Sequence, residues 1–447
     1  MWMSAPSLAA VSLALAPTLV AVQAMVTPAD PDEDAAVRLH VSTEIKANFR
    51  WSEDDRFPLA TPFPPEFLPL GEPNVALQTV APGSSLEVNK ATVFLDLELP
   101  RQIGARVKLD FIDLHDRNPT STDKVIDVDE AWVSFGSRQE SLRPIEGTSL
   151  YALLGKACKF ERQLNRRLES YGLVSTAFNR FPDLQLQVGG SLGQYVYFFG
   201  QVSNGNPTFF RDPNALAGDN GTGTPPPPNP DPALHTGFPI FYHAEVEDLE
   251  LDDRFEYGGG VGFRLLSFDQ ERGLDVLGFY YRTRLSEAAK LNGTYYEGDL
   301  DLLRGAGIPP DQLEGDRRTE YGGNLDLRLG GFSAFAQLVK EEAASLPRTG
   351  FEVEAAYRFV LGDLADPAAL FPSIQPAVRY SRIDNDFTAP PIFITLSALW
   401  DWEKWDFGLR VAIVRGLDLT LEYAYHDIAA RRAIGHDEFL ATLRLRF

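Results

Sequence analysis

The stretch that decides the fold is AVRLHVSTEIKANFRW, residues 36–51. Its odd-numbered residues are apolar apart from Thr43, and its even-numbered residues from Arg38 on are all polar or charged. A strand places alternate side chains on opposite faces, whereas a helix would spread these charges around its axis. Strands of soluble proteins are typically about 5–6 residues long, and a tilted membrane-spanning strand needs about 9–11. The stretch therefore predicts one long strand with an apolar and a polar face.

The same alternation recurs down the chain and predicts an all-β protein. We predict sixteen strands, at residues 36–51, 86–100, 103–113, 127–135, 150–160, 184–191, 194–203, 256–268, 275–285, 319–329, 332–341, 351–361, 374–383, 404–414, 417–427 and 437–447. Counts of 14 or 18 strands stay open, because the stretch IFITLSALW at 392–400 is assigned to a loop or to an extension of the strand at 404.

The connections between these strands alternate in length. Short connections are predicted at 101–102, 136–149, 192–193, 269–274, 330–331, 362–373 and 415–416. Long connections are predicted at 52–85, 114–126, 161–183, 204–255, 286–318, 342–350, 384–403 and 428–436. This alternation is typical of a transmembrane antiparallel up-and-down β-barrel with short periplasmic turns and long outer loops. A soluble multi-domain β-sandwich remains the alternative fold.

Composition supports the barrel and narrows the class of function. The chain has 447 residues, a mean hydropathy of −0.17, and no apolar run after residue 25 that reaches the roughly 18 residues of a membrane helix. Its 36 Gly and 32 Pro fit many turns. A net charge of −22 argues against a nucleic-acid partner. Cys158, the lone cysteine, has no partner for an internal disulfide, and no motif calls for a cofactor.

The ends and loops complete the domain organisation. Residues 1–24 hold an apolar stretch ending in Val-Gln-Ala and are predicted to be a signal peptide for export. Residues 25–35 are acidic and predicted to be disordered, and residues 36–447 form the barrel domain. Within that domain, residues 204–255 are predicted to be a long, acidic and proline-rich outer loop.

Four stretches resemble a known family. They are LLGKACKFERQLNRRLESYG (153–172), VGGSLGQYVYFFGQVSNGNP (188–207), IQPAVRYSRIDND (374–386) and the terminal Phe447. The first three are similar to segments of the phosphate-selective porins of the O and P type. Phe447 resembles the assembly signal of Gram-negative outer-membrane barrels.

The resemblance implies a 16-stranded porin of the outer membrane, commonly trimeric, whose inward-folded loops narrow the pore. It also implies passive diffusion of small hydrophilic or anionic solutes and a phosphate channel lined by basic residues. The partners implied are outer-membrane lipid, lipopolysaccharide and the barrel assembly machinery.

The alternation of faces sorts the charges of the predicted strands. If the polar face lines the lumen, the inward basic residues are Arg38, Lys46, Arg50, Lys90, Arg106, Lys108, Arg282, Arg284, Arg328, Arg358, Arg379, Arg410, Arg444 and Arg446. The third long loop, 161–183, is the candidate constriction loop. Five basic residues lie at its start: Lys156, Lys159, Arg162, Arg166 and Arg167.

Phe160, Leu164 and Leu168 in this loop recur at helical spacing, so we predict a short amphipathic helix over 160–168. Packed on the barrel wall, such a helix would turn its arginines into the pore, where Lys and Arg select anions. Solvated surface charges, or ion pairs with Glu161 and Glu169, are the alternative.

Other functions are weaker alternatives. An acidic cluster is a weak Ca²⁺ candidate: Glu245, Glu247, Asp248, Glu250, Asp252 and Asp253. No G-x-S-x-G or H-E-x-x-H motif is present, so an enzyme is not expected and an outer-membrane hydrolase is a minor alternative. A non-conducting adhesin or structural barrel would tend to have fewer strands and a packed interior.

Overall fold

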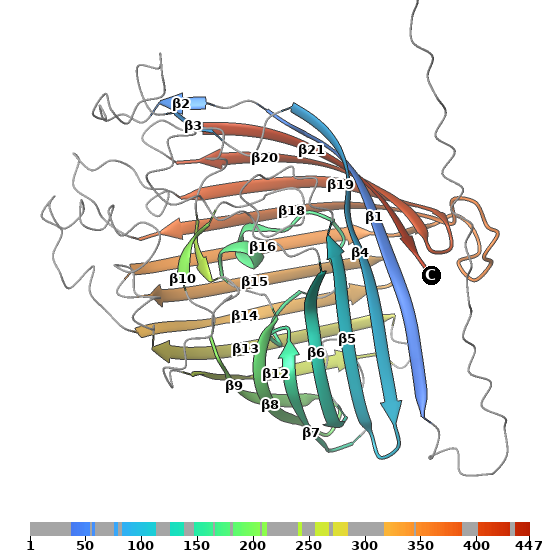
Figure 1. Ribbon diagram of the computed structural model, residues 1–447, viewed down its shortest axis with the longest axis vertical. Coiled ribbons are helices and arrows are strands. Elements are labelled where there is room, and N and C mark those ends of the chain that lie inside the picture. Colours follow the sequence, from blue (N-terminus) through green and yellow to red (C-terminus); the bar gives the residue numbers. More distant parts are fainter. Residues whose placement is uncertain are drawn as a thin grey trace, which may run out of the picture.

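The protein is an antiparallel barrel whose strands follow one another around the ring (Figure 1). A computed structural model describes residues 37–53, 56–58, 76–78, 83–112, 126–137, 147–163, 166–178, 182–205, 208–211, 240–243, 255–267, 271–284, 317–343, 346–386, 401–429 and 434–447. In this part of the chain sixteen strands close the barrel, which confirms the predicted fold class.

The barrel strands run in chain order. They are β1 (Arg38–Ser52), β4 (Gly83–Leu99), β5 (Ile103–Ile112), β6 (Ile126–Gly136), β7 (Ser149–Ala157), β8 (Asp183–Leu192), β9 (Val196–Ser203), β12 (Glu256–Leu266), β13 (Arg272–Arg284), β14 (Arg317–Leu329), β15 (Phe332–Ala343), β16 (Leu346–Tyr357), β18 (Ser373–Asn385), β19 (Trp402–Val414), β20 (Leu417–Ile428) and β21 (Ile434–Arg446). The two-residue β17 (Phe359–Val360) continues β16 along β18. Two small hairpins, β2 (Arg56–Pro58) with β3 (Ala76–Gln78) and β10 (Thr208–Arg211) with β11 (Ile240–His243), lie outside this ring.

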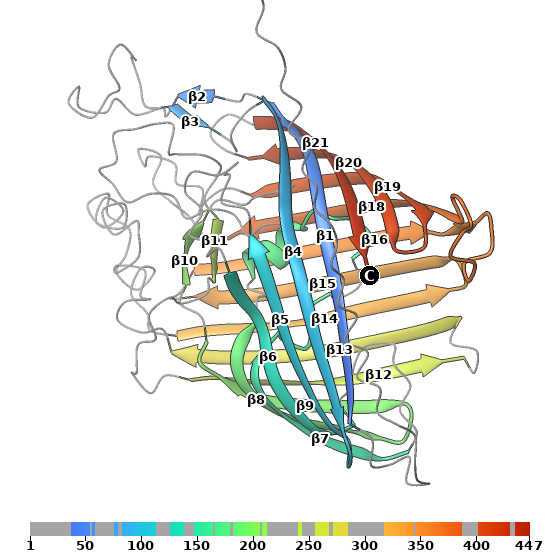
Figure 2. The same cartoon turned by 45° about the vertical axis from the view of Figure 1, so that its right-hand side comes forward.

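The first and last barrel strands close the ring. β1 pairs with β4 on one side and with β21 on the other, where Glu44 faces Arg446 and Trp51 faces Phe439 (Figure 2). At the C-terminal end of the seam, the backbone N–H of Thr43 donates to the carbonyl oxygen of Phe447 at 2.8 Å. The N–H of Phe447 donates in return to the carbonyl oxygen of Thr43 at 3.1 Å. Closure removes the unpaired edges that an open sheet would leave.

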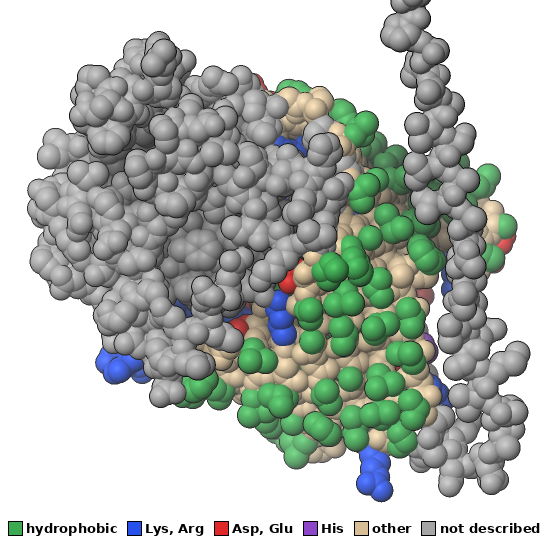
Figure 3. Space-filling view, viewed as in Figure 1, with side chains coloured by type: hydrophobic (Ala, Val, Ile, Leu, Met, Phe, Trp, Pro, Cys, Tyr) green, Lys and Arg blue, Asp and Glu red, His purple; other side chains and the backbone are tan. Residues whose placement is uncertain are grey.

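The outward face of the wall is apolar. Leu443, Leu445 and Phe447 of the last strand are exposed there, and so are the outward residues Val261 and Phe407 of other strands. Figure 3 shows hydrophobic side chains spread over the visible wall. An exposed apolar surface of this extent is unfavourable in water and stable in contact with lipid chains. No helix among the described residues is long and apolar enough to cross a membrane.

One predicted connection is corrected, and four predicted segments lie wholly or mostly outside the described residues. The connection predicted to be long at 342–350 is short, because β15 continues to Ala343 and β16 begins at Leu346. Both strands are longer at this end than predicted, by two residues in β15 and five in β16. The stretch 392–400, the predicted signal peptide, residues 25–35 and most of 204–255 lie outside the described residues.

Candidate functional site

The segment between β7 and β8 lies inside the barrel. Its described parts run from Cys158 to Gln163 and from Arg166 to Phe178, and they include the one-turn helix α1 (Leu173–Ala177). The described parts of 160–168 contain no helix, so the predicted amphipathic helix is wrong, and the helical turn comes five residues later. The reason is visible in the contacts, because described residues of this loop bind different parts of the wall.

Aromatic packing holds the start of the loop. The ring of Phe160 stacks on Phe199 with centroids 4.5 Å apart and lies 5.6 Å from the ring of Tyr197. Both partners point inward from β9 and are buried. Tyr197 lies flat on the wall because Gly262 of β12 has no side chain, and a Cβ there would fall 1.9 Å from the ring. The barrel interior on this side is therefore a hydrophobic core.

Buried ion pairs fix the same end of the loop. The ammonium of Lys159 lies 2.6 Å from the carboxylate of Glu256 on β12. Arg318 of β14 contacts the same carboxylate at 2.5 Å and also contacts Glu320 and Glu341, at 2.6 and 2.7 Å. These four strand side chains are fully buried, so each charge depends on its neighbours for solvation.

The middle of the loop is bound to β13–β16. Glu161 accepts a hydrogen bond from the hydroxyl of Tyr281 at 2.6 Å, and its backbone oxygen accepts one from Asn324 at 2.6 Å. The backbone N–H of Arg167 donates to Glu354 at 2.9 Å, and its side chain donates to Ser333 at 3.1 Å. Arg167 therefore faces the wall.

The turn at 169–171 is held by β18, β19 and β20. Glu422 accepts hydrogen bonds from the backbone N–H groups of Glu169 and Ser170, the latter at 3.1 Å. Arg379 donates to the backbone oxygen of Ser170 at 3.0 Å, and Lys404 donates to that of Tyr171 at 2.8 Å. We call the inward faces of β9, β12–β16 and β18–β20 the covered wall, because the loop packs against them.

One carboxylate joins the loop both to the covered wall and to the two strands beyond it. Glu169 lies 2.9 Å from Lys46 of β1, 2.8 Å from Arg410 of β19 and 2.7 Å from Arg444 of β21. Burial by itself would raise the pKa of Glu169, but the three cations lower it well below its ordinary range. Glu169 is therefore ionised at neutral pH and holds the loop beside the seam of the barrel.

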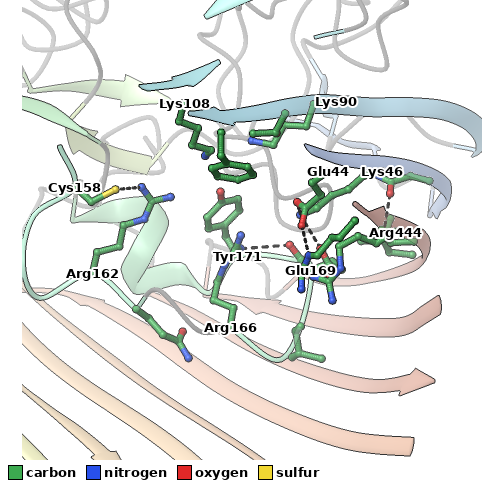
Figure 4. A pocket seen from close by; sticks show the side chains of 18 of the residues that line it. Glu44, Lys46, Lys90, Lys108, Cys158, Arg162, Arg166, Glu169, Tyr171 and Arg444 are labelled. Atoms are coloured by element: carbon green, nitrogen blue, oxygen red, sulfur yellow. Dashed lines mark hydrogen bonds and ion pairs between the residues drawn. The ribbon is translucent and has the colours of Figure 1, made fainter. Parts of the chain in front are cut away.

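A cavity of about 240 Å³ remains between the loop and the opposite wall (Figure 4). We call that wall, the inward faces of β21, β1, β4, β5 and β6, the open wall. The cavity is lined by Glu44, Lys46, Asn48, Lys90, Thr92, Phe94, Lys108, Glu130, Cys158, Arg162, Gln163, Arg166, Leu168, Glu169, Tyr171, Leu440, Thr442, Arg444 and Arg446. Seven of these side chains are cationic and three are carboxylates, which leaves an excess of four positive charges in a chain whose net charge is −22.

The cations of the cavity differ in their partners. Lys90 lies 2.6 Å from Asp110 and Lys108 contacts Asp129, so carboxylates of the strands offset both charges. Arg162 donates to the sulfur of Cys158 at 2.9 Å, and Arg166 donates to the backbone oxygens of Glu169 and Ser170 at 3.3 and 3.1 Å. Burial raises the pKa of Cys158 to about 11, so this thiol is neutral at pH 7. The two loop arginines thus donate to neutral groups.

Tyr171 lies in the middle of this arrangement. The guanidinium of Arg166 stacks 3.6 Å from the centre of its ring. Figure 4 shows the Tyr171 hydroxyl directed toward the side of the cavity where Lys90 and Lys108 lie. Burial would raise the pKa of Tyr171, but Arg166, Arg162 and Lys90 lower it to about 8. Its hydroxyl is neutral at pH 7 and becomes anionic above about pH 8. Sequence reasoning missed this residue, since a tyrosine in a loop carries no pattern.

The structure separates the five basic residues of the predicted constriction. Arg162 and Arg166 line the cavity, whereas Lys159 and Arg167 turn to the covered wall. The ammonium of Lys156 lies 3.8 Å from Asp127 and is not part of the lining.

The basic residues predicted along the lumen also divide. The lining includes Lys46, Lys90, Lys108, Arg444 and Arg446. Others keep the inward register but bind elsewhere or lie toward the ends: Arg38, Arg50, Arg106, Arg328, Arg379 and Arg410. Arg358 is exposed where β16 passes into β17.

Arg282 and Arg284 are a correction. In register, Arg282 faces Tyr257 and Thr319, and both arginines are exposed on the same face of β13 as Gly278 and Tyr280, outside the barrel. Leu277, Phe279 and Tyr281 of β13 point inward because they pack in the core beneath the loop. The rule that polar residues line the lumen therefore fails for these two arginines of β13.

A second polar cluster lies inside β1, β19, β20 and β21. Ser52 donates to Glu438 at 2.9 Å, and His426 and His436 lie 3.4 and 3.5 Å from that carboxylate. The indole of Trp402 donates to His426 at 3.1 Å. A serine hydrolase needs the serine to donate to the histidine, and here it donates to the carboxylate. This cluster does not form a nucleophile–base pair.

The acidic cluster predicted as a weak Ca²⁺ site lies outside the described residues. Within the described part of the chain, no group of three or more His, Cys, Asp or Glu residues is arranged to hold a metal ion.

Fold and cavity together define a closed antiparallel barrel whose lumen is narrowed by the loop between β7 and β8. The outer membrane channel DcaP of Acinetobacter baumannii shares this fold, with a TM-score of 0.51 and 9% sequence identity over 94% of this chain and 99% of that chain. OprB of Pseudomonas putida aligns with a TM-score of 0.50 and 8% identity over 92% and 94%. No protein-family model matches the chain, and no curated protein matches it. At such identities the similarity concerns the fold alone.

Proposed function

We propose that the protein is an outer-membrane porin that passes small hydrophilic solutes by diffusion and prefers anions. The observation that carries the proposal is the cavity between the loop and the open wall, with its excess of four positive charges. A cationic lining attracts anions and repels cations, and the effect is strongest where the lumen is narrow and screening is incomplete. The apolar outward face supports the placement in a membrane.

Arg162 and Arg166 contribute most to the preference for anions. Among the described residues their contacts are a neutral thiol and two backbone oxygens, so a passing anion meets charges that no carboxylate in this part of the chain offsets by direct contact. A guanidinium group also binds oxyanions in a bidentate manner, which suits carboxylate or phosphate solutes. The narrower preference for phosphate rests only on the sequence resemblance. The homotrimer, export by the signal peptide and recognition of Phe447 by the assembly machinery are further proposals.

The test is the reversal potential of the purified protein in a planar bilayer under a KCl gradient. The wild type should prefer chloride, and Arg162→Gln with Arg166→Gln should reduce that preference, since the excess falls from four charges to two. Arg382→Gln is the control, because it removes one arginine of the outward face and leaves the cavity lining unchanged. A preference for potassium in the wild type would overturn the anion proposal, and the absence of any conductance would favour a structural barrel.

A further inference from the structure

The histidine of β20, His426, is held in one protonation arrangement by its neighbours. The indole N–H of Trp402 donates to Nδ1 of His426 at 3.1 Å, and both side chains are buried. An indole nitrogen can only donate, so Nδ1 accepts, and neutral His426 carries its proton on Nε2. Nε2 lies 3.4 Å from the carboxylate of Glu438. Trp402 therefore selects one neutral tautomer of His426, whose N–H faces an acceptor.

A protonated His426 does not fit this arrangement. The second proton would be on Nδ1, where it would oppose the indole N–H of Trp402 across 3.1 Å. Lys404 also faces His426 in register between β19 and β20, and its side chain is fully buried. A positive charge on His426 would repel that ammonium with little water to screen the two. Protonation of His426 therefore acts on two residues of β19 at once.

These two residues of β19 also hold the loop inside the barrel. Lys404 donates to the backbone oxygen of Tyr171 at 2.8 Å. Trp402 belongs to the same buried hydrophobic cluster as Leu173 and Val174 of α1. A change at His426 is thus transmitted to the loop along two separate routes, one through a hydrogen bond and one through the core.

The surroundings of His426 provide a counter-charge for its protonated form. The charged and titratable groups around it come from β1, β19 and β21: Arg50, Lys404, Asp406, His436 and Glu438. Glu438 lies between the two histidines, 3.5 Å from His436, and can offset a charge on either. Of these two, His426 is the one that faces Lys404 and accepts from Trp402.

We propose that His426 is an acid-sensitive switch of the constriction, whose protonation releases the loop from β19 and narrows the lumen. Between the loop and the open wall lies the cavity of about 240 Å³, so a loop that leaves the covered wall moves into it. Histidine is the side chain whose charge ordinarily changes between about pH 5 and 8. The narrowing of a conducting path rests on the porin function proposed above, whereas release of the loop does not.

Hydrogen exchange with mass spectrometry measures release of the loop in the full chain in detergent. Peptides that cover residues 168–178 are compared at pH 7 and at about pH 4.5, after correction for the pH dependence of the chemical exchange rate. In the wild type this segment should exchange at least about tenfold faster at acidic pH and recover on return to pH 7. β5, on the open wall, should stay protected throughout.

Conductance in planar bilayers is recorded separately at the same two pH values. It should fall at least about twofold in acid, because the released loop occupies part of the cavity. If the wild type does not conduct at either pH, the porin function fails, while the exchange measurement still tests the switch.

His426→Gln removes the titration and keeps both hydrogen-bonding roles. Its amide oxygen can accept from Trp402, and its amide N–H can donate to Glu438. The loop of this variant should stay protected, and its conductance should stay constant, between pH 7 and about 4.5. His436→Gln is the matched control, since it makes the same substitution beside the same carboxylate, and it should respond to acid as the wild type does.

Four results would overturn the proposal. The first two are unchanged protection of the wild-type loop in acid and loss of the acid response in His436→Gln. The third is a loss that persists in His426→Gln, which would assign it to carboxyl groups beneath the loop, such as Glu422. The fourth is simultaneous loss of protection in β5, which would show acid unfolding of the barrel.

A second variant decides if His426→Gln does not fold. Trp402→Phe removes the N–H that opposes a proton on Nδ1 and keeps an aromatic ring in the core. It should reduce the acid-induced exchange of residues 168–178, since one of the two routes to the loop is lost. Acid-induced exchange equal to that of the wild type contradicts the proposal.

Discussion

The covered wall and the open wall belong to one barrel, but their inward side chains are stabilised in different ways. On the covered wall, inward tyrosines, phenylalanines and ion pairs without access to water pack against the loop, as in the core of a soluble protein. On the open wall, lysines and arginines face a cavity and retain partial exposure, as Lys90 and Lys108 do. A buried charge that loses its partner is costly, whereas a solvated one is not. The comparison therefore predicts that the two walls respond differently to the same kind of substitution.

The largest effect is expected from the buried ion cluster of the covered wall. Arg318→Met leaves the carboxylates of Glu256, Glu320 and Glu341 close together without their shared cation. We expect the free energy of unfolding to fall by about 3–5 kcal/mol, as when one partner of a buried ion pair is removed. Urea unfolding in detergent measures it. Arg446→Met on the open wall is the control, since its side chain is about half exposed, and it should cost about 1 kcal/mol or less. Equal losses in both variants would refute the distinction.

A smaller effect is expected from a pair of glycines on the two faces of the same hairpin. Gly262→Ala would press a methyl group into the ring of Tyr197, where a Cβ meets Cζ at 1.9 Å. Overpacking of this kind costs about 1–3 kcal/mol. Gly278→Ala points outward, and no atom lies within 4 Å of its added Cβ, so stability should stay the same or rise slightly. The same unfolding assay compares them, and a larger loss at Gly278 would show that the inward packing is wrong.

The smallest effect is a dependence of ion selectivity on pH. Tyr171 is neutral below its pKa of about 8 and negative above it, so the positive excess of the cavity falls from four to three as pH rises through 8. The preference for chloride should therefore decline between pH 7 and 9 in reversal-potential measurements. Tyr171→Phe should abolish that decline. The control Tyr195→Phe, in the turn between β8 and β9, should preserve it. A decline that persists in Tyr171→Phe would assign the titration to another group.

The sequence predicted the barrel well because the strands of the open wall follow the simple alternation apart from one bulge each in β4 and β6. Residues 36–51 and 437–447 pair as the closing strands, with Phe439 outward and Arg444 inward. The alternation was less informative on β13, where Phe279 and Tyr281 point inward and Arg282 points outward. Whether a strand faces water or a folded loop depends on contacts between residues more than a hundred positions apart, such as Tyr281 with Glu161.

The candidate site was predicted in part for the same reason. The basic composition of residues 156–167 drew attention to the loop that lies inside the barrel, but the local sequence does not distinguish Lys159 and Arg167 from Arg162 and Arg166. Only their partners distinguish them: Glu256 and Glu354 come from strands far along the chain. Local spacing suggested a helix at 160–168, and these tertiary contacts override it.

Cys158, the single cysteine of the chain, allows access to the loop to be measured by chemical labelling. The sulfur of Cys158 is buried beneath the guanidinium of Arg162, at the point where the loop leaves the barrel strand. Because Cys158 also lines the cavity, a thiol reagent must enter the lumen and displace the Arg162 guanidinium to reach it, so the labelling rate of the unmodified protein measures access to the cavity. The chain has no second thiol, so all labelling reports this one position.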